Sequence, residues 1–110
     1  MVFLPTAASI SAAASGTIPA DTRCSITNAD AAGAYPISTF TWMILYKEQH
    51  YADRSKAQAI ATLDLLKYIL SDEAQHITSE VHYAPLPAKA KELSLSNLKA
   101  VTYDGEAIHN

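Results

Sequence analysis

The side chains that could perform chemistry are few in this chain and widely spaced. Four histidines and a single cysteine, Cys24, occur among 110 residues. His76 and His82 are six residues apart, which is the wrong interval for one helix face, and no carboxylate completes a triad with them. Nucleophilic catalysis needs a base beside the nucleophile, and a zinc site needs several close ligands. We therefore predict no catalytic residue, no metal site and no cofactor.

Neighbouring acidic residues have a structural explanation. Asp72 and Glu73 lie in the first turn of a predicted helix, where the helix dipole favours negative charge. Residues 53–56 have the pattern of a solvated helix start. Because Cys24 is alone, neither an internal disulfide nor a metal site of the CxxC type can form. The residue types thus predict that the chain is not an enzyme.

An oxyanion site is the remaining kind of chemistry to consider. A buried anion is held by convergent donors, which are N–H groups at helix N-termini, hydroxyls and arginines. No Gly-rich loop lies beside either arginine of this chain. We assign no ligand-binding residue to it. If the chain bound an anion by itself, the donors would have to be sought among Ser38, Thr39, Thr41, Arg23 and Arg54.

The composition narrows the function further. Hydrophobic residues make up 49% of the chain and charged residues 17%, so it can bury a core. The net charge is −3 and the cations are scattered, which argues against a nucleic-acid surface. The longest apolar run, residues 42–46, is far shorter than the roughly 20 residues of a membrane span. With no Lys or Arg before Arg23, no signal peptide is predicted.

Local signals predict helices along much of the chain. Ser55 and Gln58 form a capping box at the start of a helix whose apolar residues recur at helical spacing. Residues 17–34 read as a loop, with at most a short strand at Cys24–Thr27 and another stub at Val2–Leu4. The predicted helices are Ala7–Ser15 with Thr6 as its cap, Ser55–Leu70, Asp72–Val81 and Pro87 to about Ala100, and Asp104-Gly105 is a predicted turn.

The clearest predicted strand is Ser38–Tyr46, which is rich in β-branched and aromatic residues. Both of its faces are largely apolar, which is typical of a strand covered on both sides in an α/β sheet. We predict that it is a core strand with these buried residues: Phe40, Trp42, Ile44 and Leu45.

That strand lacks obvious partners in the chain. Fully burying one large apolar side chain contributes about 1.5–3 kcal/mol, so several left in water would be a serious loss. The chain supplies helices for a sheet that it does not contain, and we interpret it as part of a larger α/β domain. The alternative is a small helical domain with one β-hairpin.

Three stretches together resemble the C-terminal third of the phosphate-binding proteins, the extracytoplasmic capture subunits of bacterial phosphate ABC transporters. The order and spacing of the stretches carry the resemblance, and Tyr-Pro-Ile-Ser with Tyr-Ala-Pro-Leu-Pro downstream is its most specific part. The stretches are Val2–Thr6 with Ala12–Ala14, Ala34–Trp42 leading into Ile44–Gln49, and the helix Ala59–Leu70 followed by Tyr83–Pro87 and Thr102–Gly105.

The resemblance implies an α/β fold of the type II periplasmic-binding-protein class, of which this chain is the C-terminal part of a two-lobed clamshell. Residues 1–35 would end the second lobe and approach the hinge, and residues 36–110 would supply a strand and helices that complete the first lobe. The parent protein would be periplasmic or otherwise extracytoplasmic. It would bind inorganic phosphate between its lobes and deliver it to the permease of the ABC transporter.

In that family, the groups that hold phosphate sit in earlier Gly/Ser/Thr-rich loops, and no stretch here matches them. The role implied for this segment is therefore structural, namely lobe completion and hinge. We also expect Met1 not to be the natural start of the functional protein. Three alternatives stay open: a binding protein for another oxyanion, a non-enzymatic interaction module that reuses the segment, and, least favoured, an enzyme such as a phosphatase.

Overall fold

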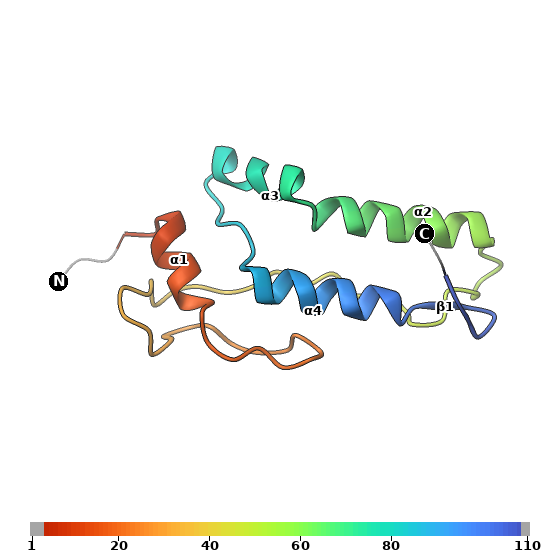
Figure 1. The fold of residues 1–110 in the computed structure, drawn as a ribbon, viewed down its shortest axis with the longest axis horizontal. Coiled ribbons are helices and arrows are strands. Elements are labelled where there is room, and N and C mark those ends of the chain that lie inside the picture. The colour runs from red at the N-terminus through yellow and green to blue at the C-terminus, as the bar shows by residue number, and fades with distance from the viewer. Residues whose placement is uncertain (1–3, 109–110) are drawn as a thin grey trace.

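The computed structural model describes residues 4–108, so the predicted stub Val2–Leu4 lies largely outside the described residues. Within that range the regular secondary structure is mostly helix, and it ends in one short β-ribbon (Figure 1). The elements are α1 (Ala7–Ala13), α2 (Lys56–Ile69), α3 (Asp72–Thr78), the 3-10 turn η1 (Ser79–Val81), α4 (Ala88–Lys99), β1 (Thr102–Tyr103) and β2 (Glu106–Ala107).

Side-chain caps explain where three of the helices begin. The hydroxyl of Thr6 accepts from the backbone N–H of the third helical residue of α1, and Ser55 does the same for Gln58 in α2. Both caps are reciprocal capping boxes. Ser71 caps α3 through the N–H of Ala74 at 3.2 Å. Each such cap is worth about 1 kcal/mol. The predicted helices are confirmed, with α1 ending two residues before Ser15.

The last helix and the turn after it are confirmed as well. α4 begins directly after Pro87, whose fixed φ suits a helix entrance. Asp104 and Gly105 both have positive φ, 54° and 77°, which is the conformation that a two-residue hairpin turn requires. The turn joins β1 to β2 with Thr102 opposite Ala107. The strands of this ribbon were not predicted.

Apolar side chains gather in two separate clusters. The C-terminal cluster lies between α2, α4 and the ribbon, and contains Ala59, Leu63, Leu66, Leu98, Val101 and Ile108. The N-terminal cluster lies between α1 and the loops after it, and contains Ala13, Ala14, Ile26 and Ala34. The second cluster is built mostly of alanines, so it buries little apolar area per residue.

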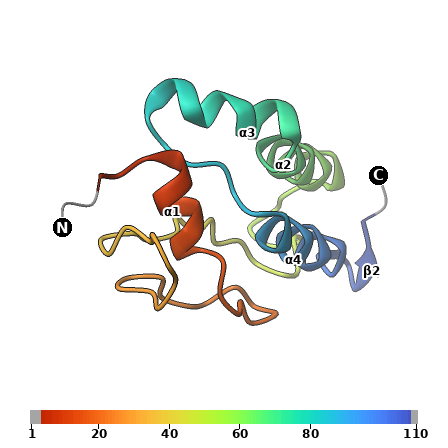
Figure 2. The same cartoon turned by 60° about the vertical axis from the view of Figure 1, so that its left-hand side comes forward.

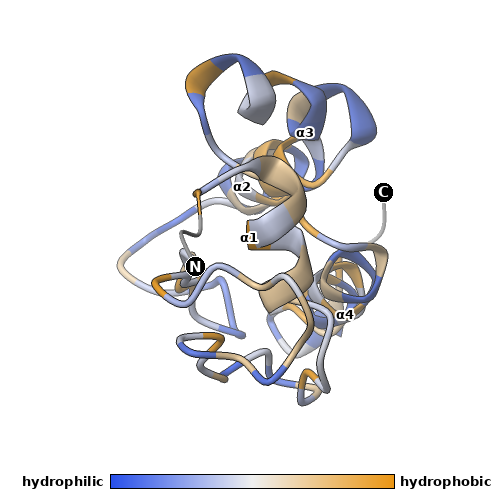
Figure 3. Cartoon of the chain, turned by 90° about the vertical axis from the view of Figure 1, so that its left-hand side faces the viewer, coloured by the Kyte–Doolittle hydropathy of each residue, from blue (hydrophilic) through white to orange (hydrophobic). Residues whose placement is uncertain are grey.

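The two clusters give the molecule an extended shape. It measures 54 × 27 × 21 Å, with a radius of gyration of 16.1 Å, whereas a compact domain of this length has about 13 Å. α1 and the loops after it lie at one end of the long axis, and the first turn of α2 lies at the other (Figures 1 and 2). The loops below α1 alternate between hydrophobic and hydrophilic residues rather than forming one apolar layer (Figure 3).

The predicted strand Ser38–Tyr46 is not formed in this chain, and neither is the stub Cys24–Thr27. Residues 38–46 run as a coil between the two clusters, drawn in yellow in Figure 1. Of the predicted core residues, Phe40 and Leu45 are half-buried against the N-terminal and C-terminal clusters, respectively. Trp42 is 43% exposed and Ile44 is 95% exposed. The prediction of a buried strand is therefore wrong for this chain.

Residues 38–46 do not form a strand because no other strand of the described chain pairs with them. A strand is defined by backbone hydrogen bonds to a neighbouring strand, and within residues 4–108 no backbone group bonds to the backbone of residues 38–46. Immediately afterwards the chain does find one. Thr102 donates to the carbonyl of Lys47 and accepts from the N–H of Gln49, both at 2.8 Å, in a parallel bridge. A fold of helices with one small sheet agrees with the predicted α/β class only in that both helices and strands are present. It also agrees with the alternative prediction of a small helical domain with one β-hairpin.

Candidate functional site

The three hydroxyls that were candidates for binding an anion either donate hydrogen bonds within the chain or lie apart from one another. Ser38 is buried and donates to the carbonyl of Tyr35 at 2.7 Å. Thr39 donates to the carbonyl of Phe40 at 3.1 Å. Thr41 borders an apolar cavity described below. These three hydroxyls therefore do not converge on one point.

Arg23 is engaged at the surface. Its Nε donates to Asp21 at 2.8 Å, and both side chains are at least half exposed. The backbone N–H of Arg23, followed by its side chain, lowers the pKa of the Asp21 carboxyl. An exposed pair between residues two apart in a loop contributes little to stability and forms no enclosed anion site.

Arg54 is engaged between helix and loop. Its Nη2 donates to Gln49 at 3.2 Å and to Thr62 at 2.9 Å, and its guanidinium lies 5.3 Å from the ring centroid of Tyr51. Among the residues that the structure describes, the buried Nε atom of Arg54 finds no hydrogen-bond partner. Tyr103 donates to the backbone carbonyl of Arg54 at 2.8 Å. The side chain thus joins the middle of α2 to residues 49–51, and it does not meet Arg23 or the three hydroxyls.

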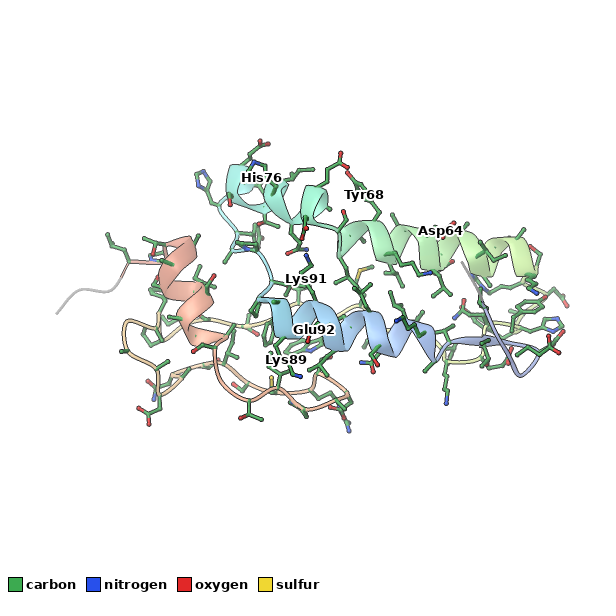
Figure 4. All side chains as sticks on the ribbon, viewed as in Figure 1. Asp64, Tyr68, His76, Lys89, Lys91 and Glu92 are labelled. Carbon is green, nitrogen blue, oxygen red and sulfur yellow. The ribbon has the colours of Figure 1, made fainter. Side chains whose placement is uncertain are left out.

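The histidines of the described chain lie in different segments. Within residues 4–108, no three His, Cys, Asp or Glu side chains come together as metal ligands. His76 lies on α3 (Figure 4), is exposed, and borders a hollow that Pro85 and Lys91 also line. His82 follows η1 in a left-handed conformation. Asp72 is a first-turn acid of α3 as predicted, and it pairs with Lys91, which lowers its pKa.

Glu48 forms a polar node that the sequence did not predict. Its carboxylate accepts from the backbone N–H groups of His50 at 2.8 Å, Asp104 at 3.0 Å and Gly105 at 2.8 Å, and from the hydroxyl of Thr102 at 3.0 Å. These donors, with Gly105 the strongest, lower the pKa of Glu48 to about 2. The node fastens the turn of the C-terminal ribbon to residues 47–50.

His50 reinforces that node. Its Nδ1 pairs with the carboxylate of Asp104, which raises the pKa of the imidazole. Its ring stacks on Tyr103 with 4.7 Å between centroids. The spacing of 54 residues between His50 and Asp104 offers no sequence signal, because only the closure of the ribbon brings them together. All these groups bind one another, so we interpret the node as structural.

One hollow in the described chain is apolar and adjoins residues 40–45. A cavity of about 190 Å³ lies between residues 40–45 and the helices α2 and α4. Its polar neighbours are Thr22, Thr41, Ser94 and Asn97, and no charged side chain lines it. A dianion leaving water must recover its hydration from many fixed donors. This cavity suits apolar side chains and not phosphate. Its apolar lining includes Leu45, Leu66, Leu70, Leu86, Ala90 and Leu98.

The segment that borders this cavity is itself unusual. None of the backbone N–H groups from Ile37 to Tyr46 donates a hydrogen bond within residues 4–108. The indole N–H of Trp42 donates to the carbonyl of Thr22 at 3.0 Å, which ties the segment to the preceding loop. Residues 37–46 therefore present an unpaired backbone with exposed apolar side chains, and we call them the unpaired segment.

Comparison with known proteins gives one informative relative. The chain is 36% identical over 86 residues to the phosphate-binding protein PstS of Xylella fastidiosa, a match that covers 76% of this chain. The match covers 22% of that relative, so the chain spans less than a quarter of its length. No family model matches the chain, and no solved structure gives a significant match. No helix within residues 4–108 is long and apolar enough to cross a membrane.

Proposed function

We propose that this chain is the C-terminal part of an extracytoplasmic phosphate-binding protein that captures inorganic phosphate for an ABC importer. The observation that supports this proposal most strongly is the sequence match to the Xylella protein, which extends over most of the chain. In this proposal the segment has a structural role, completing one lobe and forming part of the hinge. Phosphate, the membrane permease and the periplasmic location are attributes of the parent protein.

The packing also divides the chain into two parts, with the division between residues 40 and 45, a few residues after the boundary proposed here. The N-terminal cluster draws its members from residues 12–40, and the C-terminal cluster draws its members from residues 45–108. We propose that residues 1–35 belong to the end of the second lobe and residues 36–110 to the first. The unpaired segment begins at that boundary.

The composition of the unpaired segment supports the proposal that it forms a strand of a sheet in the parent protein. No charged residue occurs from Ala31 to Tyr46, and the unpaired segment is largely apolar on both faces. Helices α2 and α4 flank it across the cavity, as helices flank a strand in an α/β layer. We propose that strands from the preceding part of the parent pair with it there, giving the type II periplasmic-binding-protein fold.

A structural role also fits the state of the candidate donors. Ser38 and Arg54 are bonded within the chain, and Arg23 is held by Asp21 at the surface. A clamshell site draws its donors from both lobes and closes around the ligand. We therefore propose that the phosphate ligands lie in the part of the parent that precedes these residues.

A chimera tests the proposal. Residues 1–110 replace the matching segment of the Xylella phosphate-binding protein, and phosphate binding is measured by isothermal titration. We expect the chimera to bind phosphate and the truncated relative without any replacement not to bind. Within the chimera, Trp42→Ala should lower the free energy of unfolding by about 3–5 kcal/mol, because the indole becomes core. A folded chimera that binds no phosphate would overturn the proposal.

The isolated chain provides the complementary measurement. Titrated with phosphate at physiological salt, it should show no saturable heat at micromolar ligand, since screened surface cations bind phosphate only weakly. Saturable micromolar binding would contradict the structural role. The variants to examine would then be those at Ser38, Thr39, Thr41, Arg23 and Arg54.

A further inference from the structure

We propose that two copies of this 110-residue chain associate through the unpaired segment, residues 37–46, by antiparallel strand pairing. The inference goes beyond the proposed function, because it concerns the chain by itself. It rests on the backbone, the side chains and the charge of one segment, taken in turn below.

The backbone supplies the first reason. A row of unpaired N–H and C=O groups is a template for another strand. From Ile37 to Tyr46 no N–H donates within the described chain, and only the carbonyls of Ser38, Phe40 and Tyr46 accept, each from a side chain. The residues that follow the segment already pair with another part of the chain, because Glu48 forms a parallel β-bridge with Thr102. The segment thus continues an edge that is partly built.

Side-chain exposure supplies the second reason. Ile44 is 95% exposed, Ile37 78%, Tyr46 66% and Met43 59%. Isolated exposed apolar residues are ordinary on a protein surface, but these four lie within ten residues of one segment, and concentrated apolar exposure is typical of interaction sites. Pairing two such segments places β-branched and aromatic residues opposite one another, which is the favourable cross-strand combination.

The absence of charge favours a second copy as the occupant. Natural edge strands are protected from self-pairing by lysines, acids or prolines, and the sequence has none of these between Ile37 and Tyr46. An uncharged segment does not repel its own copy, and an antiparallel pair about a two-fold axis uses the same surface twice. A lone two-stranded ribbon is marginal in water unless it packs on helices. Here α2 and α4 flank the segment across the cavity and supply that support.

The direct test needs no variant. Sedimentation of the purified chain from about 5 to 500 μM should show a reversible monomer–dimer equilibrium, as expected for an interface at the small end of the range. Over the same concentrations, hydrogen exchange of the amides of residues 39–46 should slow with the dimer fraction. Amides of α2 should not change. A monomer at every concentration would overturn the proposal.

Two variants separate strand pairing from simple hydrophobic contact. Ile44→Lys introduces a charge, and Ile44→Pro removes an N–H while leaving an apolar side chain; both should abolish the dimer. Because Ile44 is almost fully exposed, neither removes a folded contact of the monomer. The matched control is Leu65→Lys on α2, where the leucine is 58% exposed, and this variant should dimerise normally. Dimerisation that survives Ile44→Pro, or fails only in Leu65→Lys, would overturn the proposal.

The chimera distinguishes this inference from the proposed function. A chain that stays monomeric alone, while residues 39–46 are protected only in the chimera, would assign the segment to strands of the parent and overturn self-pairing. A dimer of the isolated chain together with a chimera that binds no phosphate would support self-pairing and contradict the proposed function.

Discussion

Leu63 and Ile44 are side chains of similar size and hydropathy, yet the first is 1% exposed and the second 95% exposed. Leu63 lies on α2, whose backbone hydrogen bonds are satisfied within the helix, so one apolar face needs only a second helix to cover it. Ile44 lies in the unpaired segment, where both the backbone and the side chains need neighbours. The comparison shows that a helix can be completed locally, whereas a strand depends on chain that lies elsewhere.

The N-terminal and C-terminal clusters differ in the same way. The C-terminal cluster uses leucines from two helices and closes with the ribbon. The N-terminal cluster uses alanines from α1 and loops. We expect the first to be the stable part of the isolated chain, because it buries more apolar area per residue.

The largest effect should come from the centre of the C-terminal cluster. Leu63→Ala should lower the free energy of unfolding by about 2–5 kcal/mol, because it leaves a cavity among packed side chains. Urea denaturation followed by circular dichroism measures the change. The control Leu65→Ala, on the exposed face of the same helix, should change it by no more than about 0.5 kcal/mol. Equal effects would mean that α2 does not bury the face described here.

The capping box of α2 should have a smaller effect. Ser55→Ala removes the acceptor for the N–H of Gln58 and should cost about 1 kcal/mol. Ser55→Asp keeps an acceptor and should restore most of the stability. The same urea titration is the measurement, and a neutral Ser55→Ala would show that the helix start is held by Arg54 and its neighbours instead.

Trp42 should matter little in the isolated chain. Its indole is 43% exposed, and Trp42→Ala should lower the free energy of unfolding by less than about 1 kcal/mol there. The same change in the chimera is expected to cost several times more, as stated above. A loss of about 3 kcal/mol or more in the isolated chain would show that the segment already has a core environment.

The smallest and most local effect should be the pH response of the ribbon. Glu48 has its pKa lowered from 4.5 to about 2, so its contribution is complete above pH 4.5 and is lost as pH falls through 2. His50 has its pKa raised from 6.5, so its contribution is complete below pH 6.5 and is lost as pH rises through the higher value. The ribbon should therefore be best held between pH 4.5 and 6.5.

The chemical shift of the Gly105 amide reports on this response. It should be constant between these pH values and move outside them as the carboxylate or the imidazole changes charge. Glu48→Gln should remove the acid transition and leave the alkaline one, while His50→Gln should do the reverse. An amide that stays unchanged from pH 2 to 9 would contradict the node as described.

The sequence alone determined those features whose causes lie within a few residues. The caps at Thr6 and Ser55, the helical spacing along α2 and the Asp104-Gly105 turn act through neighbours three or four residues apart, and each is confirmed. The sequence also indicated that a segment apolar on both faces lacks partners within this chain. Only the tertiary structure decided which groups meet across long separations, as Glu48 does with Gly105 and Arg54 with Tyr103. It also decided that residues 38–46 stay unpaired, because strand formation depends on a neighbour that no local pattern can supply.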